Sequence, residues 1–264
     1  MSLFDRLAAV LRGPAPTNAV PASPLLACVD PAQLAAPSAL IRLGTQYGGW
    51  LLPADVALDA SSICYLAGAG EDISFDCALV ERYGCRARII DPTPRAVAHF
   101  EALTQAVRNG TRLAINGRAD AFYEISPEAF SRLSFHAVGL SDQDAVLKFF
   151  MPKNPAHVSC STVNLQKTDT FFTAQCHRVA TVMGQLGDTH LDLLKMDIEG
   201  AEYAVIRDIV SSKILPRILL IEFDEVHSPQ DRAAADRIRH HVGLLHDAGM
   251  RCIAVDGCNA TFVA

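Results

Sequence analysis

Short apolar runs of strand length alternate with longer amphipathic segments along most of the chain. Continuous apolar runs are typical of strands that are buried on both faces of a sheet, whereas apolar positions three and four apart indicate helices. The pattern predicts strands at residues 63–67, 86–90, 191–196 and 217–223, and helices at residues 73–83, 94–107, 203–210 and 233–248. This alternation of strands and helices predicts an α/β fold with a mostly parallel sheet covered by helices on both faces.

Two further regions show a strand pattern without a following helix. Residues 133–140 are predicted to form a third strand that turns through residues 141–144 into a hairpin with residues 145–150, and residues 176–183 form another strand-like run. Near the end of the chain, Asp256-Gly257 separates two apolar runs, at residues 251–255 and 259–263. Asp-Gly between apolar runs is a strong hairpin signal, so the chain is predicted to end in a hairpin.

The first part of the chain differs from the rest. Six prolines occur between residues 13 and 37, and prolines at this density disfavour regular structure. We therefore interpret residues 1–43 as an N-terminal extension with a Pro/Ala-rich linker or a segment draped over the domain, and residues 44–264 as the domain itself. At its beginning, Tyr47 and Trp50 flank a pair of glycines. Either side chain could cover a ligand ring, or Trp50 could pack against the sheet.

Composition narrows the possible functions. The net charge of −6 at pH 7 argues against a general nucleic-acid binder, which needs a basic face. No apolar run approaches the length of a membrane span, and the apolar part of the N-terminus is too short for a signal peptide. Eight cysteines without a C-x-x-C pair suit buried, reduced thiols better than a disulfide framework or a zinc site, and we expect no metal among the site residues. We expect a cytoplasmic protein whose partner is a small molecule; its oligomeric state is left open.

The first predicted strand ends in a glycine turn, Gly68-Ala69-Gly70, before a helix. A strand, a glycine turn and a helix form a cofactor-binding unit, because the backbone can approach the ligand closely at glycine. Asp91 stands at the tip of the second strand, 23 residues after Gly68. That spacing is suited to hydrogen bonds with ribose hydroxyls, although Asp91 could instead cap the next helix. Gly139 and Leu140, at the end of the predicted third strand, are placed to contact an adenine ring.

Carboxylates gather directly after the run at residues 191–196. Asp197, Glu199 and Glu202 surround Gly200 just before a predicted helix. Ligands of open parallel sheets bind at the carboxyl ends of the strands, which makes this segment a candidate for chemistry. The alternative is that Asp197 caps the helix and the glutamates favour its positive N-terminus.

The residue patterns of these segments resemble the motifs of a known family. Residues 195–202 (KMDIEGAE) resemble the K-x-D-x-E-G-A-E signature of the FkbM-type methyltransferases, and residues 65–76 (YLAGAGEDISFD) and 91–94 (DPTP) are similar to glycine and acidic motifs found among them. The resemblance covers about residues 44–264. It implies S-adenosylmethionine as cofactor, a Rossmann-like seven-stranded class I methyltransferase sheet with an antiparallel last strand, and methyl transfer to a hydroxyl of a small-molecule or sugar-containing acceptor.

The chain departs from the usual class I pattern at two positions. Such enzymes more often carry an acidic residue where Leu66 stands and a third glycine where Asp72 stands. The carboxylate that would hold the methionine amino group of the cofactor is therefore missing from its usual place. Glu71 or Asp72 could supply it, or both could simply belong to the first turn of the helix.

The resemblance assigns expected roles. We expect Asp197 to act as base or acceptor-orienting group, with Lys195 holding its charge and Glu199 as a further catalytic candidate. The acceptor side is expected to include Glu222 and His227, after the strand at residues 217–223, and two serines of a polar segment, Ser159 and Ser161.

Three other functions remain open. A Mg²⁺ ion held by Asp197, Glu222 and Asp224 could assist the same transfer. An NAD(P)-binding oxidoreductase is a rival, but its first turn would be expected to read G-x-G-x-x-G, whereas Ile73 stands at the third glycine position here. The third is a cofactor-binding module without catalytic activity.

Overall fold

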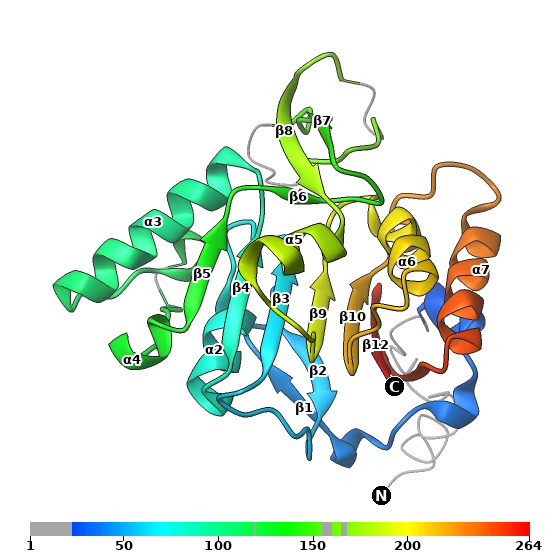
Figure 1. The fold of residues 1–264 in the computed structure, drawn as a ribbon, viewed down its shortest axis with the longest axis horizontal. Coiled ribbons are helices and arrows are strands. Elements are labelled where there is room, and N and C mark those ends of the chain that lie inside the picture. The colour runs from blue at the N-terminus through cyan, green and yellow to red at the C-terminus, as the bar shows by residue number, and fades with distance from the viewer. Residues whose placement is uncertain (1–22, 119, 155–159, 165–167) are drawn as a thin grey trace, which may run out of the picture.

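A seven-stranded sheet forms the centre of the computed structural model, which describes residues 23–118, 120–154, 160–164 and 168–264 (Figure 1). The strand order is β11-β12-β10-β9-β3-β4-β5. In chain order the strands are β3 (Ile63–Ala67), β4 (Arg86–Ile90), β5 (Leu133–His136), β9 (Leu193–Met196), β10 (Ile218–Glu222), β11 (Arg251–Asp256) and β12 (Asn259–Val263). Neighbours from β5 to β10 pair in parallel, whereas β12 is antiparallel to both β10 and β11. The predicted mostly parallel sheet with an antiparallel last strand is confirmed.

Helices cover both faces of this sheet because alternate strand residues point to opposite sides. Tyr65 and Leu194 belong to a core cluster with α5 (Val179–Leu186), α6 (Glu202–Ser211) and α7 (Ala234–Asp247). Their neighbours Leu66 and Leu193 belong to a second cluster with α2 (Ser74–Tyr83), α3 (Pro94–Asn109) and α4 (Pro127–Phe130). The predicted helices are confirmed; in α3, Thr93 is the N-cap and Pro94 lies in the first turn.

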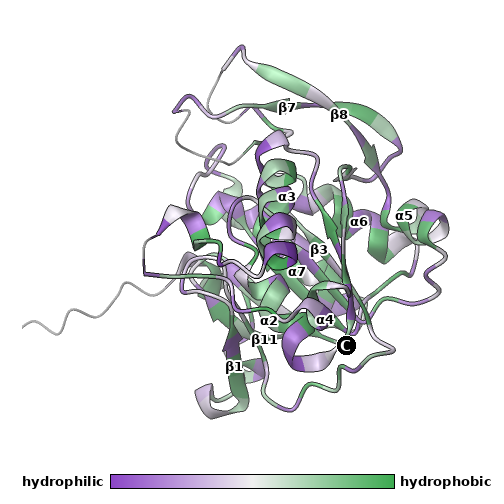
Figure 2. Ribbon diagram, turned by 90° about the vertical axis from the view of Figure 1, so that its left-hand side faces the viewer, coloured by the Kyte–Doolittle hydropathy of each residue, from purple (hydrophilic) through white to green (hydrophobic). Residues whose placement is uncertain are grey.

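The predicted hairpin between residues 133–140 and 145–150 is wrong. After β5 the chain leaves the main sheet and forms β6 (Gly139–Leu140), β7 (Ala145–Phe150) and β8 (Phe171–His177). These strands make a separate sheet of order β6-β8-β7, which projects beyond the main sheet (Figures 1 and 2). β7 pairs with β8 rather than with the strand before it. The apolar pattern indicated a strand, but its partner lies beyond a long connection.

Residues 176–183 were also predicted to be a strand, and this is wrong too. β8 ends at His177, and α5 begins at Val179. Val179 and Val182 are both buried, and their spacing of three residues suits one face of a helix. The short apolar run did not distinguish the end of a strand from the start of a buried helix.

The segment before the sheet packs against the domain. Its elements are η1 (Pro24–Cys28), η2 (Pro31–Gln33), η3 (Pro37–Ala39), β1 (Leu40–Leu43) and β2 (Trp50–Pro53); two more 3₁₀ turns, η4 (Ile115–Gly117) and η5 (Asp224–Val226), occur later. Leu25 is fully buried in the cluster beneath α7, and the Ala35 amide donates to the Ile253 carbonyl at 2.8 Å. Part of the expected extension, residues 1–22, lies outside the described residues. Among the described residues, no helix is both long and apolar enough to cross a bilayer.

Because Leu25 is buried, replacing it tests whether this segment contributes to the stability of the fold. We expect Leu25→Ala to lower the free energy of unfolding by about 2–5 kcal/mol, as loss of a buried leucine side chain usually does. Urea unfolding followed by circular dichroism measures the change. Leu26→Ala is the matched control and should cost less, because Leu26 is only partly buried. Equal small effects at both positions would show that the segment adds little to the fold.

Candidate functional site

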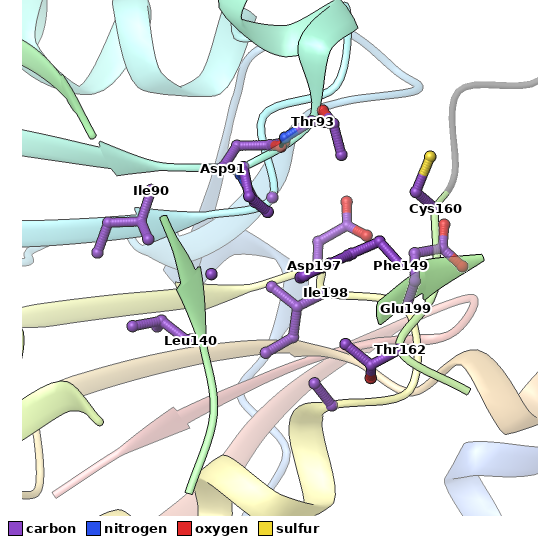
Figure 3. A pocket seen from close by; sticks show the side chains of 14 residues that line it. Ile90, Asp91, Thr93, Leu140, Phe149, Cys160, Thr162, Asp197, Ile198 and Glu199 are labelled. Carbon is purple, nitrogen blue, oxygen red and sulfur yellow. Dashed lines mark hydrogen bonds between the residues drawn. The ribbon is translucent and has the colours of Figure 1, made fainter. Parts of the chain in front are cut away.

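A pocket opens at the carboxyl ends of β3, β4 and β9 (Figure 3). The space inside it is about 400 Å³, a volume that includes open solvent at the mouth. Six of the residues predicted from the sequence line it: Gly68, Asp91, Gly139, Leu140, Asp197 and Glu199. Segments far apart in the chain thus meet where ligands of parallel sheets bind.

The pocket floor depends on a close approach between two strand ends. The Asp197 amide donates to the Ala67 carbonyl at 3.1 Å, and the Gly68 amide donates to the Ile90 carbonyl at 3.0 Å. Gly68 has a φ of +82°, and a Cβ built there would lie 1.7 Å from the Asp197 carbonyl oxygen. Only glycine therefore fits at this position, for both conformational and steric reasons.

Asp91 organises the glycine turn. Its Oδ2 accepts the amides of Ala69 and Gly70 at 2.8 and 3.2 Å, and its Oδ1 accepts the Thr93 amide at 2.7 Å. The predicted turn residues Ala69 and Gly70 thus face Asp91. A carboxylate offers about four acceptor positions, so one position on Oδ1 remains after these three bonds. Asp91 is 4 % exposed, and it still borders the pocket.

Lys195 lies buried beneath the pocket. It pairs in register with Leu66 and Leu220, and its side chain is 4 % exposed. Its Nζ donates to the Gly68 carbonyl and lies 3.9 Å from Asp197 Oδ2. The ammonium group thus reaches both the glycine turn and the proposed catalytic carboxylate, as expected from their position on one strand face.

Asp76 on α2 is a buried carboxyl that sequence reasoning did not include in the site. Burial raises the pKa of Asp76 to about 6, and the positive charge of Lys195 acts against this rise. Its Oδ1 has no hydrogen-bond partner among the described residues. The sequence feature that could have identified Asp76 is a carboxylate within an apolar helical segment, directly after Phe75.

Glu202 shapes the loop that carries Glu199. Its carboxylate accepts the amides of Ile198 and Gly200 at 3.0–3.2 Å, and Ser161 Oγ donates to the Glu199 carbonyl. Glu199 itself has a φ of +52°, a conformation that needs such support in a residue other than glycine. Burial raises the pKa of Glu202. The expected substrate residue Ser161 thus holds the loop and does not line the pocket.

Glu222 and His227 lie beside the pocket near Asp197 but do not line it. Burial raises the pKa of Glu222 to about 8, and the negative charge of Asp197 adds to this rise. Cys258 Sγ donates to Glu222 Oε1 at 2.9 Å, and His227 Nε2 lies 2.9 Å from the same sulfur. Cys258 joins this group through the β10–β12 pairing, which no local sequence signal reveals.

The remaining predicted residues lie elsewhere. Glu71 forms a two-pronged ion pair with Arg95 at 2.7 and 3.0 Å. The Asp72 carboxylate accepts the Thr45 hydroxyl at 2.7 Å and the Ser74 amide at 3.0 Å. Neither lines the pocket, and Ser159 falls outside the described residues. The other eight pocket residues were not predicted as site residues: Ile90, Pro92, Thr93, Phe149, Cys160, Thr162, Ile198 and Ala201.

Comparison with known families identifies the chain. The family model of the Methyltransferase FkbM domain matches residues 67–252. The chain belongs to the FkbM methyltransferase family. The solved structures include an FkbM methyltransferase from Methylobacillus flagellatus KT, with 15% sequence identity and a TM-score of 0.46. That similarity covers 80% of the present chain but 45% of the other. No curated protein matches this FkbM-family chain.

The close contact at Gly68 predicts that one added methyl group there strongly lowers the stability of the fold. Gly110→Ala is the comparison, because Gly110 also has a positive φ but open space surrounds it. It should lower the free energy of unfolding by about 1–2 kcal/mol, since alanine at positive φ is strained. Gly68→Ala should cost about 1–3 kcal/mol more, from overpacking against the Asp197 backbone. Chemical denaturation of both variants measures the difference. Equal losses of unfolding free energy in the two variants would show that the ends of β3 and β9 can move apart without loss of stability.

Proposed function

We propose that this FkbM-family protein transfers a methyl group from S-adenosylmethionine to a hydroxyl of a small-molecule or glycan acceptor. The observation that carries the proposal is the meeting of Gly68, Asp91 and Asp197 in one pocket. The strand order, with an antiparallel last strand at the β10 side, supports a class I methyltransferase arrangement.

The cofactor half of the proposal rests on the glycine turn and Asp91. The acceptor position left on Asp91 Oδ1 suits one ribose hydroxyl, and Gly139 and Leu140 offer small, apolar surface to an adenine ring. Glu71 and Asp72 are engaged within the protein, so the methionine amino group would meet other acceptors. The Asp197 and Glu199 side chains border the same pocket.

The catalytic half rests on Asp197. Its side chain is 35 % exposed and has Lys195 on one side and Glu222 on the other, so an acceptor hydroxyl can reach it. A base that takes the hydroxyl proton typically contributes about 10²–10⁴-fold.

The compartment follows from cysteine chemistry. All eight cysteines are free thiols, and six of them are buried. Buried, unpaired thiols suit a reducing environment, where disulfides are rare. We therefore propose a cytoplasmic location.

The cofactor assignment predicts that Asp91→Ala weakens S-adenosylmethionine binding by about 1–3 kcal/mol, the cost of losing a hydrogen-bonded charged partner. Isothermal calorimetry measures the affinity, with NADH as a ligand expected not to bind. Asp192→Ala is the matched control, because Asp192 is also buried and also accepts a backbone amide, that of Ile63, at the opposite edge of the sheet. Unchanged affinity in folded Asp91→Ala would contradict the ribose assignment.

The catalytic assignment predicts that Asp197→Asn loses about 10²-fold or more in methyl transfer while it keeps cofactor affinity, because an amide cannot take the proton. Incorporation of labelled methyl groups into a fractionated cell extract measures transfer and captures the product. Glu202→Gln provides the comparison; it keeps an oxygen for the loop amides and should affect stability more than rate. Equal, mild effects on transfer at both positions would remove Asp197 as the base.

A further inference from the structure

We infer that Glu222, His227 and Cys258 form a binding site for a transition-metal ion of the zinc class. The inference concerns a site beside the proposed methyl-transfer pocket and does not depend on methyl transfer. It rests on the chemistry and placement of three side chains.

The three potential ligand atoms converge on a small volume. The Glu222 carboxylate, the His227 imidazole and the Cys258 sulfur each offer one atom, and these atoms lie within 4.8 Å of one another. The sulfur lies 2.9 Å from both Glu222 Oε1 and His227 Nε2. Ligands of one zinc ion bind at about 2.0–2.3 Å from the metal, so small side-chain rotations would place an ion between them.

The backbone holds these residues in place without a metal. Glu222 pairs with Asn259, the residue after Cys258, in the β10–β12 register. The Phe223 amide donates to the Cys258 carbonyl at 2.9 Å, and the His227 amide donates to the Asp224 carbonyl at 2.9 Å. The ligands therefore come from one strand end, a short 3₁₀ turn and a hairpin turn that are already bonded to each other.

The set of donors favours a borderline or soft ion over magnesium. Thiolate and imidazole ligands select zinc and related metals, whereas Mg²⁺ and Ca²⁺ prefer oxygen. The alternative Mg²⁺ arrangement would instead use the carboxylate oxygens of Asp197, Glu222 and Asp224 and would leave the sulfur and nitrogen donors of Cys258 and His227 without a role. Binding would release the thiol proton of Cys258, since metal ligation requires the thiolate.

A nucleophilic role for Cys258 fits the geometry less well. In a catalytic cysteine site the base lies next to the thiol and a third group orients the base. Here the thiol stands between Glu222 and His227, so the carboxylate faces the sulfur and does not orient the imidazole. Three protein ligands also leave one position of a tetrahedral ion open, as in zinc sites that bind water or substrate.

Cobalt(II) tests the site directly, because a thiolate ligand produces charge-transfer absorption. We expect the metal-free full-length protein to bind one equivalent of Co²⁺ with this absorption, and Zn²⁺ to abolish it by displacement. Cys258→Ser should lose the absorption. His227→Ala should weaken Co²⁺ binding by more than about tenfold, since even changes in the outer shell of a metal site have effects of that size.

The matched control is Cys28→Ser, which removes a partly exposed thiol of η1 and should leave the titration unchanged. The inference is overturned if the folded wild-type protein shows no charge-transfer absorption, or if the absorption persists in Cys258→Ser. Calorimetry with S-adenosylmethionine on the metal-free protein separates the two proposals. Cofactor binding without metal binding would overturn only the metal site, and metal binding without cofactor binding would overturn only the cofactor assignment.

Discussion

The site depends on how closely the chain can pass at Gly68. The ends of β3 and β9 are neighbours in the sheet, and the Asp197 carbonyl occupies the space where a side chain at Gly68 would begin. Because β3 and β9 stay in contact to their ends, the glycine turn and the carboxylate loop open into one pocket. The same contact brings the Gly68 carbonyl to Lys195. A side chain at Gly68 would therefore disturb the proposed cofactor side and the proposed acceptor side together.

More carboxyl groups than positively charged groups lie around this contact. Lys195 is buried, lies 3.9 Å from Asp197 and, through its positive charge, opposes the rise that burial causes in the pKa of Asp76, while burial raises the pKa values of Glu202 and Glu222. Buried carboxyl groups that hold protons avoid the cost of unpaired charge. Perturbed pKa values in a cleft are typical of functional sites. Asp197, whose side chain is 35 % exposed, lines the pocket together with Glu199.

The small sheet β6-β8-β7 completes the pocket from outside the main sheet. Gly139 and Leu140 of β6 and Phe149 of β7 line the pocket, and Ser161 pairs with Phe150 through two backbone hydrogen bonds while its hydroxyl reaches the Glu199 loop. This sheet therefore connects the adenine side of the proposed cofactor site with the carboxylate loop. Its contribution explains why residues far from the family motifs, such as Phe149 and Thr162, belong to the site.

The sequence by itself determined the features that depend on local order. The periodicity of apolar residues located the strands of the main sheet and the helices that cover it. Gly68, Asp91 and Asp197 each follow a strand, which indicated that they would meet, because parallel strands end at one edge of the sheet. The tertiary structure alone decided contacts between distant segments: β7 with β8 rather than β5, and Cys258 with Glu222 and His227. The physical reason is that periodicity reports which face of an element is buried, whereas the identity of the partner depends on packing across the whole chain.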